Sequence, residues 1–363
     1  MRIGIDGRKI PQSAKRGPIG SLEHGKALGM EGLFFRTILD MSRTLDRGLL
    51  AAIRSRADEL GLYLEAGLGK VNPYATPEAP ELRAVGDGDI ALGFRRMMEA
   101  SAAIGCVELW VSTANRKPTF YGRLSYDRFR TDAPWSDQLA ATERFLKVLA
   151  PIARDLGIHM NIETHEEIAS FEVVRLVEAV GPDVVGVVLD TSNMLHRAEH
   201  PVRAAKRVAP YVRQTHLKDA YVAMRPGGVL LQNRPCGDGA VDFAAIIAIL
   251  LGANPKINLT IENAEPHAER TIGRTQTCVE IFDPRFHAGH PDLDVEEFAA
   301  YLKLVRDYEK GFGARGVLDW AAYEARPFGH EEAVAEIKRS AAHLLGALSK
   351  ARFATRQGQA AGP

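Results

Sequence analysis

Eight short apolar segments, separated from one another by helical patterns, constrain the fold of this chain more than any other feature. Each segment has the length and apolar content of a buried strand. They lie at 2–6, 32–37, 62–67, 106–112, 158–164, 184–191, 212–219 and 257–263. Strands that alternate with helices pair in parallel through right-handed crossovers, and eight such units close into a barrel. The sequence therefore predicts an α/β protein with a (β/α)8 TIM-barrel fold.

Helical patterns fill the intervals between these strands, but the helix that should follow the last strand is displaced along the chain. The predicted helices are 21–30, 45–61, 89–105, 136–157, 170–181, 201–211 and 242–252, followed by C-terminal helices at 295–311 and 330–350. We expect one barrel domain over 1–350, in which 264–294 is an irregular insertion after the eighth strand that acts as a lid or docks a partner. A disordered tail is expected over 351–363. A doubly wound open sheet is the competing architecture, but "GIDGRKIPQ" after the first strand lacks its glycine fingerprint.

Charge and cysteine content argue against several classes of protein. The 46 basic and 46 acidic residues balance, so a basic surface for nucleic acid is not expected. The 3 cysteines show no CxxC spacing, which suits a reducing compartment. The opening residues "MRIGIDGRKI" do not resemble a signal peptide, and no apolar stretch reaches the roughly 18 residues of a membrane span. We expect a cytoplasmic protein that binds neither nucleic acid nor membrane.

Ionisable side chains stand at the ends of the last four predicted strands. Glu163 ends the fifth strand, Asp190 the sixth, His216 the seventh and Glu262 the eighth. The carboxyl ends of barrel strands form one face, so these side chains should converge there. Three carboxylates in one pocket repel one another unless a cation binds them. We expect one divalent metal ion, Mn²⁺ first, with Mg²⁺, Co²⁺ or Zn²⁺ as alternatives.

Each of these residues, taken alone, has a simpler interpretation. Glu163 could be a solvated loop residue, Asp190 a helix cap or turn residue, and His216 a satisfied core histidine. Four ligand-type residues at four successive strand ends are much harder to explain separately. The joint pattern therefore favours a metal site.

Polar residues near the same strand ends are candidates for catalysis and substrate binding. His165 follows Glu163 by two positions, which on a strand places both side chains on one face. It is a candidate general acid or base, or a hydrogen-bonding partner of the site. Lys218 follows His216 in the same way, and could stabilise an enolate oxygen, bind a substrate hydroxyl or pair with a carboxylate. The substrate-binding candidates are Asn193, Arg234, Glu65, Trp110 and Arg36.

The segments "NIETH", "VVLDTSN", "THLKD", "RPCGDGAVDF" and "LTIENAE" carry a family resemblance. Over about residues 1–263 the chain resembles the xylose isomerase-like TIM-barrel superfamily of sugar-phosphate isomerases and epimerases. The resemblance implies one metal ion held by a Glu, an Asp, a His and a Glu, which correspond to Glu163, Asp190, His216 and Glu262. In the ketose epimerases of the family, the two glutamates also exchange protons with the substrate.

Two departures qualify the resemblance. The family often has a histidine three residues after the metal aspartate, where this chain has Asn193, and this weakens a conventional epimerase assignment. Endonuclease IV belongs to the same superfamily but uses three zinc ions and more histidines. The neutral charge and the missing ligands argue against that activity here.

The function expected from the residues and the resemblance is a metal-dependent reaction on a sugar or keto sugar. A base removes the α-proton and an enediolate forms. Reprotonation gives isomerisation or epimerisation, whereas loss of a β-substituent gives a lyase or dehydratase. The insertion after Glu262 and "EAGLGKVNPY" at 65–74 look similar to the catalytic alpha subunits of bacterial C-glycoside deglycosidases, which cleave 3-keto C-glucosides.

That likeness implies a lyase in an oligomer with a small β-rich subunit. No basic cluster is dedicated to a phosphate, which favours an unphosphorylated substrate. The non-enzymatic alternative is a sugar-binding barrel with a relic metal site, and it predicts missing ligands. All four ligand types are present in the sequence.

Overall fold

The computed structural model describes residues 1–114, 117, 122–263 and 276–360. Within that part of the chain, eight strands form one sheet in the order β10-β1-β2-β3-β4-β5-β6-β7. They are β1 (Ile3–Asp6), β2 (Gly32–Phe34), β3 (Tyr63–Lys70), β4 (Glu108–Ser112), β5 (His159–Glu163), β6 (Val185–Asp190), β7 (Val212–His216) and β10 (Leu259–Ile261). Every pairing is parallel, and a bridge between Leu217 and Ile261 brings the two edges together. The predicted (β/α)8 barrel is confirmed.

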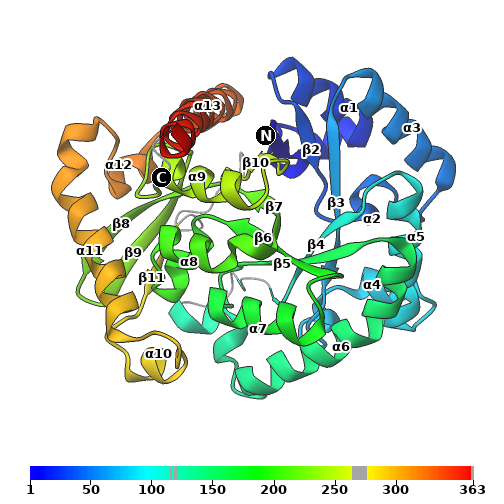
Figure 1. The fold of residues 1–363 in the computed structure, drawn as a ribbon, viewed down its shortest axis with the longest axis horizontal. Helices are drawn as coiled ribbons and strands as arrows, with labels where there is room; N and C mark the ends of the chain where they lie inside the picture. The colour runs from blue at the N-terminus through cyan, green and yellow to red at the C-terminus, as the bar shows by residue number, and fades with distance from the viewer. Residues whose placement is uncertain (115–116, 118–121, 264–275, 361–363) are drawn as a thin grey trace.

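Helices surround the strands, as Figure 1 shows. They are α1 (Ser13–Ala27), α2 (Ile38–Met41), α3 (Arg47–Glu59), α4 (Pro80–Ala84), α5 (Ile90–Ala103), α6 (Trp135–Leu156), α7 (Ser170–Val180), α8 (Pro201–Val208) and α9 (Phe243–Ala253). Several begin at an aspartate whose side chain accepts from the first turn, as Asp46 does for α3 and Asp242 for α9. Helix α1 starts at Ser13, earlier than the predicted 21–30, and it is kinked at Gly17, where φ is 67°.

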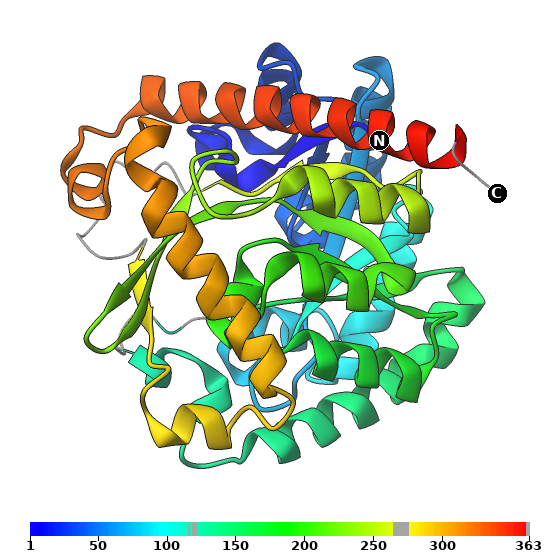
Figure 2. The ribbon, with the colours of Figure 1, turned by 60° about the vertical axis from the view of Figure 1, so that its left-hand side comes forward.

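The eighth helical position is filled from the far end of the chain. Helix α13 (His330–Ala360) packs on α9, β10 and β1, and Figure 2 shows it crossing beside the N-terminus. The displaced helix predicted after the last strand is therefore this one. The predicted disordered tail, 351–363, is wrong as far as Ala360, because the helix continues that far; 361–363 lie outside the described residues.

A second, three-stranded sheet was not predicted. The predicted strand 212–219 ends at His216, and an antiparallel hairpin follows, made of β8 (Asp219–Arg225) and β9 (Gly228–Arg234). Strand β11 (Gln276–Val279) pairs antiparallel with β9. Helix α11 (Val295–Phe312) packs on β8, and the short helices α10 (Pro284–Ala288) and α12 (Trp320–Ala325) lie nearby in the chain.

The predicted insertion is only partly irregular. Residues 264–275 lie outside the described part, whereas 276–294 contain β11 and α10. Ile281 and Phe286 are buried in a second apolar cluster together with Tyr301 of α11. This segment therefore packs on the small sheet, and its role as a lid or docking site stays a prediction.

Strands β2 and β3 pack closely against each other in the barrel. A Cβ atom on Gly32 would lie 2.1 Å from the ring of Tyr63, so β2 and β3 meet there through a glycine. The Tyr63 hydroxyl forms a 2.9 Å hydrogen bond with Thr260 inside the barrel. In the described segments, no helix has the length and apolar content to cross a membrane.

Candidate metal centre

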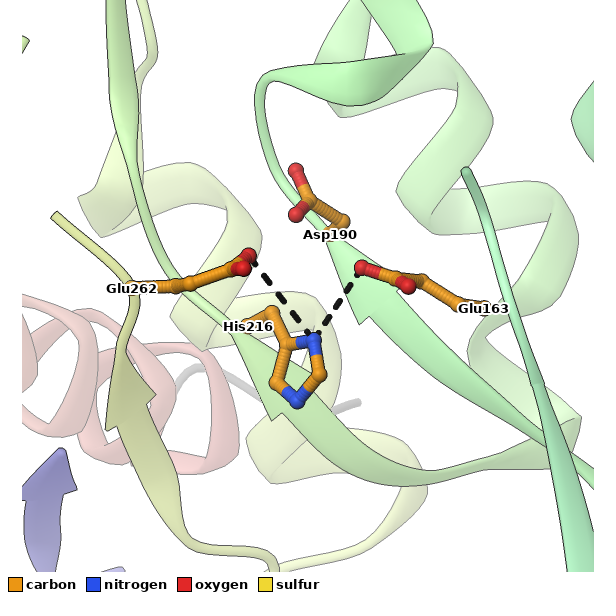
Figure 3. A group of neighbouring side chains, drawn as sticks. All are labelled: Glu163, Asp190, His216 and Glu262. Atoms are coloured by element: carbon orange, nitrogen blue, oxygen red, sulfur yellow. Dashed lines mark hydrogen bonds and ion pairs between the residues drawn. The ribbon is translucent and has the colours of Figure 1, made fainter. Parts of the chain in front are cut away.

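The four predicted ligands come together at the carboxyl ends of consecutive barrel strands (Figure 3). Glu163 ends β5, Asp190 ends β6, His216 ends β7, and Glu262 directly follows β10. One ligand atom from each residue lies within 4.8 Å of all the others, and all four side chains are buried. Strand register explains the convergence, because Asp190 pairs with His216 and the amide of Glu262 donates to the carbonyl of Leu217 at 2.9 Å.

Glu163 is held by donors on both sides. The indole Nε1 of Trp110 donates to its Oε2 at 2.8 Å, and Nδ1 of His216 lies 3.1 Å from its Oε1. Burial raises the pKa of Glu163, but the charges of His165 and His216 outweigh it and lower the pKa. The carboxylate is therefore ionised and oriented before any ligand binds.

Asp190 is fully buried, and its two oxygens have different environments. Oδ1 accepts hydrogen bonds from the amides of Ser192 at 3.0 Å and Asn193 at 2.9 Å. Oδ2 lies 2.7 Å from Nζ of Lys218. Burial, together with the charges of Glu262 and Glu163, raises the pKa of Asp190 to about 7. The charge of Lys218 opposes this shift. Burial thus disfavours the ionised form of Asp190 even though Lys218 lies beside it.

Glu262 is bound by two cationic side chains. Nζ of Lys218 donates to its Oε2 at 2.8 Å, and Nη2 of Arg36 donates to its Oε1 at 2.9 Å. Burial raises the pKa of Glu262, but the charges of Lys218 and His216 outweigh it and lower the pKa well below its usual value. Arg36 also lies over the ring of Trp110, 5.6 Å from its centroid. Its guanidinium therefore contacts both Glu262 and the indole that binds Glu163.

These residues fit a divalent cation. Three buried carboxylates and one imidazole offer oxygen and nitrogen donors of the kind that Mn²⁺, Mg²⁺, Co²⁺ and Zn²⁺ accept. Burial and the neighbouring carboxylates raise the pKa of Asp190, and a bound cation would favour its ionised form. The donor set can therefore bind a divalent metal ion.

His165 is near the cluster, although the reason differs from the predicted one. Strand β5 ends at Glu163, and the amide of His165 donates to the carbonyl of Glu163 at 2.8 Å, so a tight turn and not strand pleating places the ring. Nδ1 of His165 is paired with Oε2 of Glu167. Burial lowers the pKa of His165, but Glu167 and Glu163 outweigh it and raise the pKa to about 10.

Glu167 and Thr113 are residues of the site that the sequence reasoning missed. Glu167 has no exposed surface, and its second oxygen accepts from the hydroxyl of Thr113. Arg128 donates to the backbone carbonyl of Glu167 at 3.1 Å. The signal was present, because Glu167 belongs to the same charged run as Glu163 and His165, but its direction depends on the turn.

The remaining predicted residues differ in what they contact. The backbone N–H of Asn193 donates to Asp190, whereas its buried side chain makes no hydrogen bond within the described residues. Glu65 lies inside the barrel and accepts from Asn258 at 2.9 Å and Thr260 at 3.3 Å. Their roles in substrate binding stay predictions.

Arg234 is buried away from solvent and committed to other partners. Its guanidinium lies 3.7 Å from the ring centroid of Tyr323 and donates to the carbonyls of Leu318 at 2.9 Å and Asp319 at 3.2 Å. These contacts hold the segment around α12 against the small sheet. Substrate binding by Arg234 stays a prediction, and its contacts favour a structural role.

Sequence comparison decides the family. A family model described as "Xylose isomerase-like TIM barrel" matches residues 22–278, which is more than half of the chain. The chain belongs to this family. The xylose isomerase-like barrel that the sequence resembles is thus confirmed at the level of family and fold.

Individual relatives within the xylose isomerase-like TIM-barrel family are distant. The uncharacterized protein YihM of Escherichia coli strain K12 is 29% identical over 224 residues, which cover 60% of this chain and 66% of YihM. The match therefore spans slightly less than two thirds of that relative. The 3-oxo-isoapionate decarboxylase of Pectobacterium atrosepticum is 24% identical over 223 residues, covering 60% of this chain and 78% of the enzyme.

Solved structures agree on the fold. The 3-keto-D-glucoside 4-epimerase YcjR from E. coli has a TM-score of 0.54 and 15% identity, over 85% of this chain and 99% of that chain. At this identity the likeness shows a common xylose isomerase-like barrel and nothing finer.

Proposed function

We propose that this protein is a divalent-metal-dependent enzyme that acts on a keto sugar by removing the proton α to a carbonyl. The observation that carries the proposal is the complete and buried ligand set of Glu163, Asp190, His216 and Glu262. Relatives support the substrate class, because the names of the decarboxylase and the 4-epimerase both describe a 3-oxo or 3-keto sugar derivative. Mn²⁺ is the ion we expect, with Mg²⁺, Co²⁺ and Zn²⁺ as alternatives.

A divalent ion bound here would act as a Lewis acid that stabilises negative charge on a carbonyl oxygen and a neighbouring hydroxyl oxygen. The protein side chains supply the proton transfers. Glu163 and Glu262 are the candidate bases, since both are ionised and oriented by fixed donors. His165 is protonated at neutral pH because its pKa is raised, so it is better suited to donate a proton than to accept one.

We propose elimination as the outcome, with a 3-keto C-glucoside as the substrate. A carboxylate takes the proton from C2, and the electron pair of that C–H bond forms the double bond between C1 and C2. The bond from C1 to the aglycone breaks, and its electron pair leaves with the aglycone. His165 or Lys218 then protonates the aglycone, so the products are an unsaturated 3-keto sugar and the free aglycone.

Epimerisation is the second candidate, and it uses the same first step. It needs a second group that returns the proton to the opposite face. Two glutamates on opposite sides of the cluster, Glu163 on β5 and Glu262 after β10, provide such a pair (Figure 3). A non-enzymatic barrel with a relic site is a third candidate, and it predicts weak, substoichiometric metal binding.

The test uses the Mn²⁺-loaded protein, with and without a candidate small β-rich subunit. It is incubated with a 3-keto C-glucoside and, separately, with free ketoses in D₂O. We expect release of the aglycone. Deuterium incorporation and a new epimer from a free ketose, with the glucoside intact, would show that epimerisation is the reaction.

A further inference from the structure

Arg197 is a buried cation that forms no ion pair with an acidic residue in the part of the chain that the structure describes. It is 3% exposed, and its guanidinium makes one hydrogen bond there, from Nη1 to Nε2 of His290 at 3.0 Å. Its Nε is enclosed and donates to no acceptor. Because a buried charge is costly without a counter-charge, Arg197 needs a partner that the described side chains do not supply.

His290 is a neutral partner of Arg197. Burial lowers the pKa of His290 well below its usual value, and the charges of Arg128 and Arg197 lower it further. Nδ1 lies 2.5 Å from the carbonyl oxygen of Phe286 and therefore carries the proton of the neutral ring. Nε2 is then the acceptor for Arg197, so this hydrogen bond brings no negative charge to the guanidinium.

The carboxylates that act on Arg197 are committed to other cations. Glu172 pairs with Arg128 at 2.7 Å, and Glu167 pairs with His165. Burial lowers the pKa of Arg197 to about 10, and Arg128 adds to this effect, while Glu167 and Glu172 oppose it only in part. The charge of Arg197 is therefore incompletely compensated.

A small cavity lies beside this guanidinium. It is lined by Arg197 and by the rings of Tyr126 and Phe129, which lie 5.3 and 5.8 Å from the guanidinium carbon. The volume of the cavity is about 10 Å³. That is the space of about one water-sized sphere, so one water molecule or one monatomic ion fits and a polyatomic oxyanion does not.

Two other charged residues line the cavity, and their charges cancel. They are Arg123 and Glu280. The guanidinium of Arg123 pairs with Asp283 at 3.4 Å, and its backbone N–H donates to Oε2 of Glu280 at 2.9 Å. The lining therefore keeps the single positive charge of Arg197.

A second buried donor in this region also lacks an acceptor. The hydroxyl of Tyr301 on α11 has no exposed surface and makes no hydrogen bond within the described segments. Burial raises the pKa of Tyr301, and the nearby charge of Arg197 opposes this rise. Buried polar groups are almost always hydrogen-bonded, so two such groups in one region point to a ligand that accepts hydrogen bonds.

We infer that the cavity beside Arg197 binds one monatomic anion, for which chloride is the natural candidate. A water molecule would satisfy the N–H groups but not the charge, whereas a halide does both. Arg197 is the last residue of the 3₁₀-helix η5 (Asn193–Arg197), whose first amide donates to the metal-site residue Asp190. The anion thus holds the far end of a segment that begins at the metal centre.

The experiment compares the wild type with Arg197→Gln, which keeps polar atoms at this position but removes the charge. The matched control is Arg175→Gln, because Arg175 is an exposed arginine of α7 that pairs with Asp292 at 2.8 Å. Thermal unfolding is followed while potassium gluconate is replaced stepwise by chloride, bromide or sulfate at constant ionic strength. General effects of each salt act on all three proteins and cancel in the comparison.

We expect the Tm of the wild type and of Arg175→Gln to rise by about 1 to 3 °C as chloride reaches about 0.3 M, because an ion that binds only the folded state stabilises it. Bromide should have the same effect. Arg197→Gln should show no halide-specific rise. Sulfate, which is too large for the cavity, should affect the three proteins equally.

Diffraction from wild-type crystals that contain bromide gives a second measurement, which stands even if Arg197→Gln does not fold. An anomalous peak in contact with the Arg197 guanidinium is the expected result. A water molecule in its place would overturn the anion site. Equal halide dependence in the wild type and Arg197→Gln would also overturn it, and so would a bromide peak without halide-dependent Tm, since binding would then occur at crystal concentration only. Neither measurement uses a substrate, so both are independent of the proposed reaction.

Discussion

The ammonium nitrogen of Lys218 lies 2.7 Å from Oδ2 of Asp190, a carboxylate without exposed surface. The same nitrogen donates to Glu262 at 2.8 Å. Lys218 therefore neutralises two of the residues that would hold a metal ion. A cation placed this way opposes metal binding and, once a substrate is present, can stabilise negative charge on its oxygen.

Lys218→Met should separate these two effects. Without the competing charge, the affinity for Mn²⁺ should rise about 10-fold or more. Turnover should fall about 10²-fold, since a donor to the developing oxyanion is lost. Calorimetric titration of Mn²⁺ and steady-state kinetics measure both, with Lys206→Met, an exposed position of α8, as the control. Weaker metal binding in Lys218→Met would contradict the charge argument.

Trp110→Phe tests how Glu163 is oriented. Phenylalanine keeps an aromatic ring in the core but removes the Nε1 donor that binds Glu163 at 2.8 Å. Loss of a hydrogen bond that orients a metal ligand typically costs about 10- to 100-fold in metal affinity, and we expect that range here. Trp135→Phe is the matched control, because its Nε1 donates to Glu172 at 3.2 Å and not to a metal ligand. Equal Mn²⁺ affinity in the two variants would show that the Trp110 bond has no such role.

His165→Ala should lower turnover about 10² to 10⁴-fold, the usual range for a group that transfers a proton. Metal content should not change, since the imidazole of His165 is paired with Glu167 and not with any of the four candidate metal ligands. His159→Ala, at the other end of β5, serves as the control. Turnover close to that of the wild type would give His165 a structural role only.

Asp219→Asn should destabilise the protein without altering the ligands of the metal. The buried Asp219 carboxylate accepts from the amides of Ala220, Gly237, Gly239 and Val241 at 2.9 to 3.0 Å. An amide side chain has one oxygen, so some of these donors lose their partner, and we expect a loss of about 2 kcal/mol in the free energy of unfolding. Asp238→Asn, in the loop whose amides bind Asp219 but with a more exposed side chain, should change it by less than about 0.5 kcal/mol. Chemical denaturation of both variants checks the difference.

The convergence of the four candidate metal ligands could be predicted because their positions depend only on strand order. Parallel strands place their carboxyl ends on one face, so Glu163, Asp190, His216 and Glu262 had to converge once the eight strands were recognised. The same reasoning could not place His165, since the direction of its ring depends on the turn after Glu163.

The small sheet could have been found from the sequence. "DAYVAMR" and "GVLLQNR" flank Pro226 and Gly227, a dipeptide typical of a hairpin turn. The pattern at 212–219 predicts one strand that includes Asp219, whereas in the structure Asp219 begins the hairpin. The pairing of β11 with β9 is a long-range contact, and no local pattern around 276–279 indicates it.

The metal content of Asp190→Asn tests the central claim most directly. Asparagine keeps the size of the side chain and an oxygen for the amides of Ser192 and Asn193, but removes the charge. The wild type and Asp190→Asn are purified, dialysed against Mn²⁺ and analysed for bound metal, with thermal unfolding as a check of the fold. We predict about one ion per chain in the wild type, and a folded variant with little metal and no turnover. Full metal occupancy in folded Asp190→Asn would contradict the assignment of the metal centre.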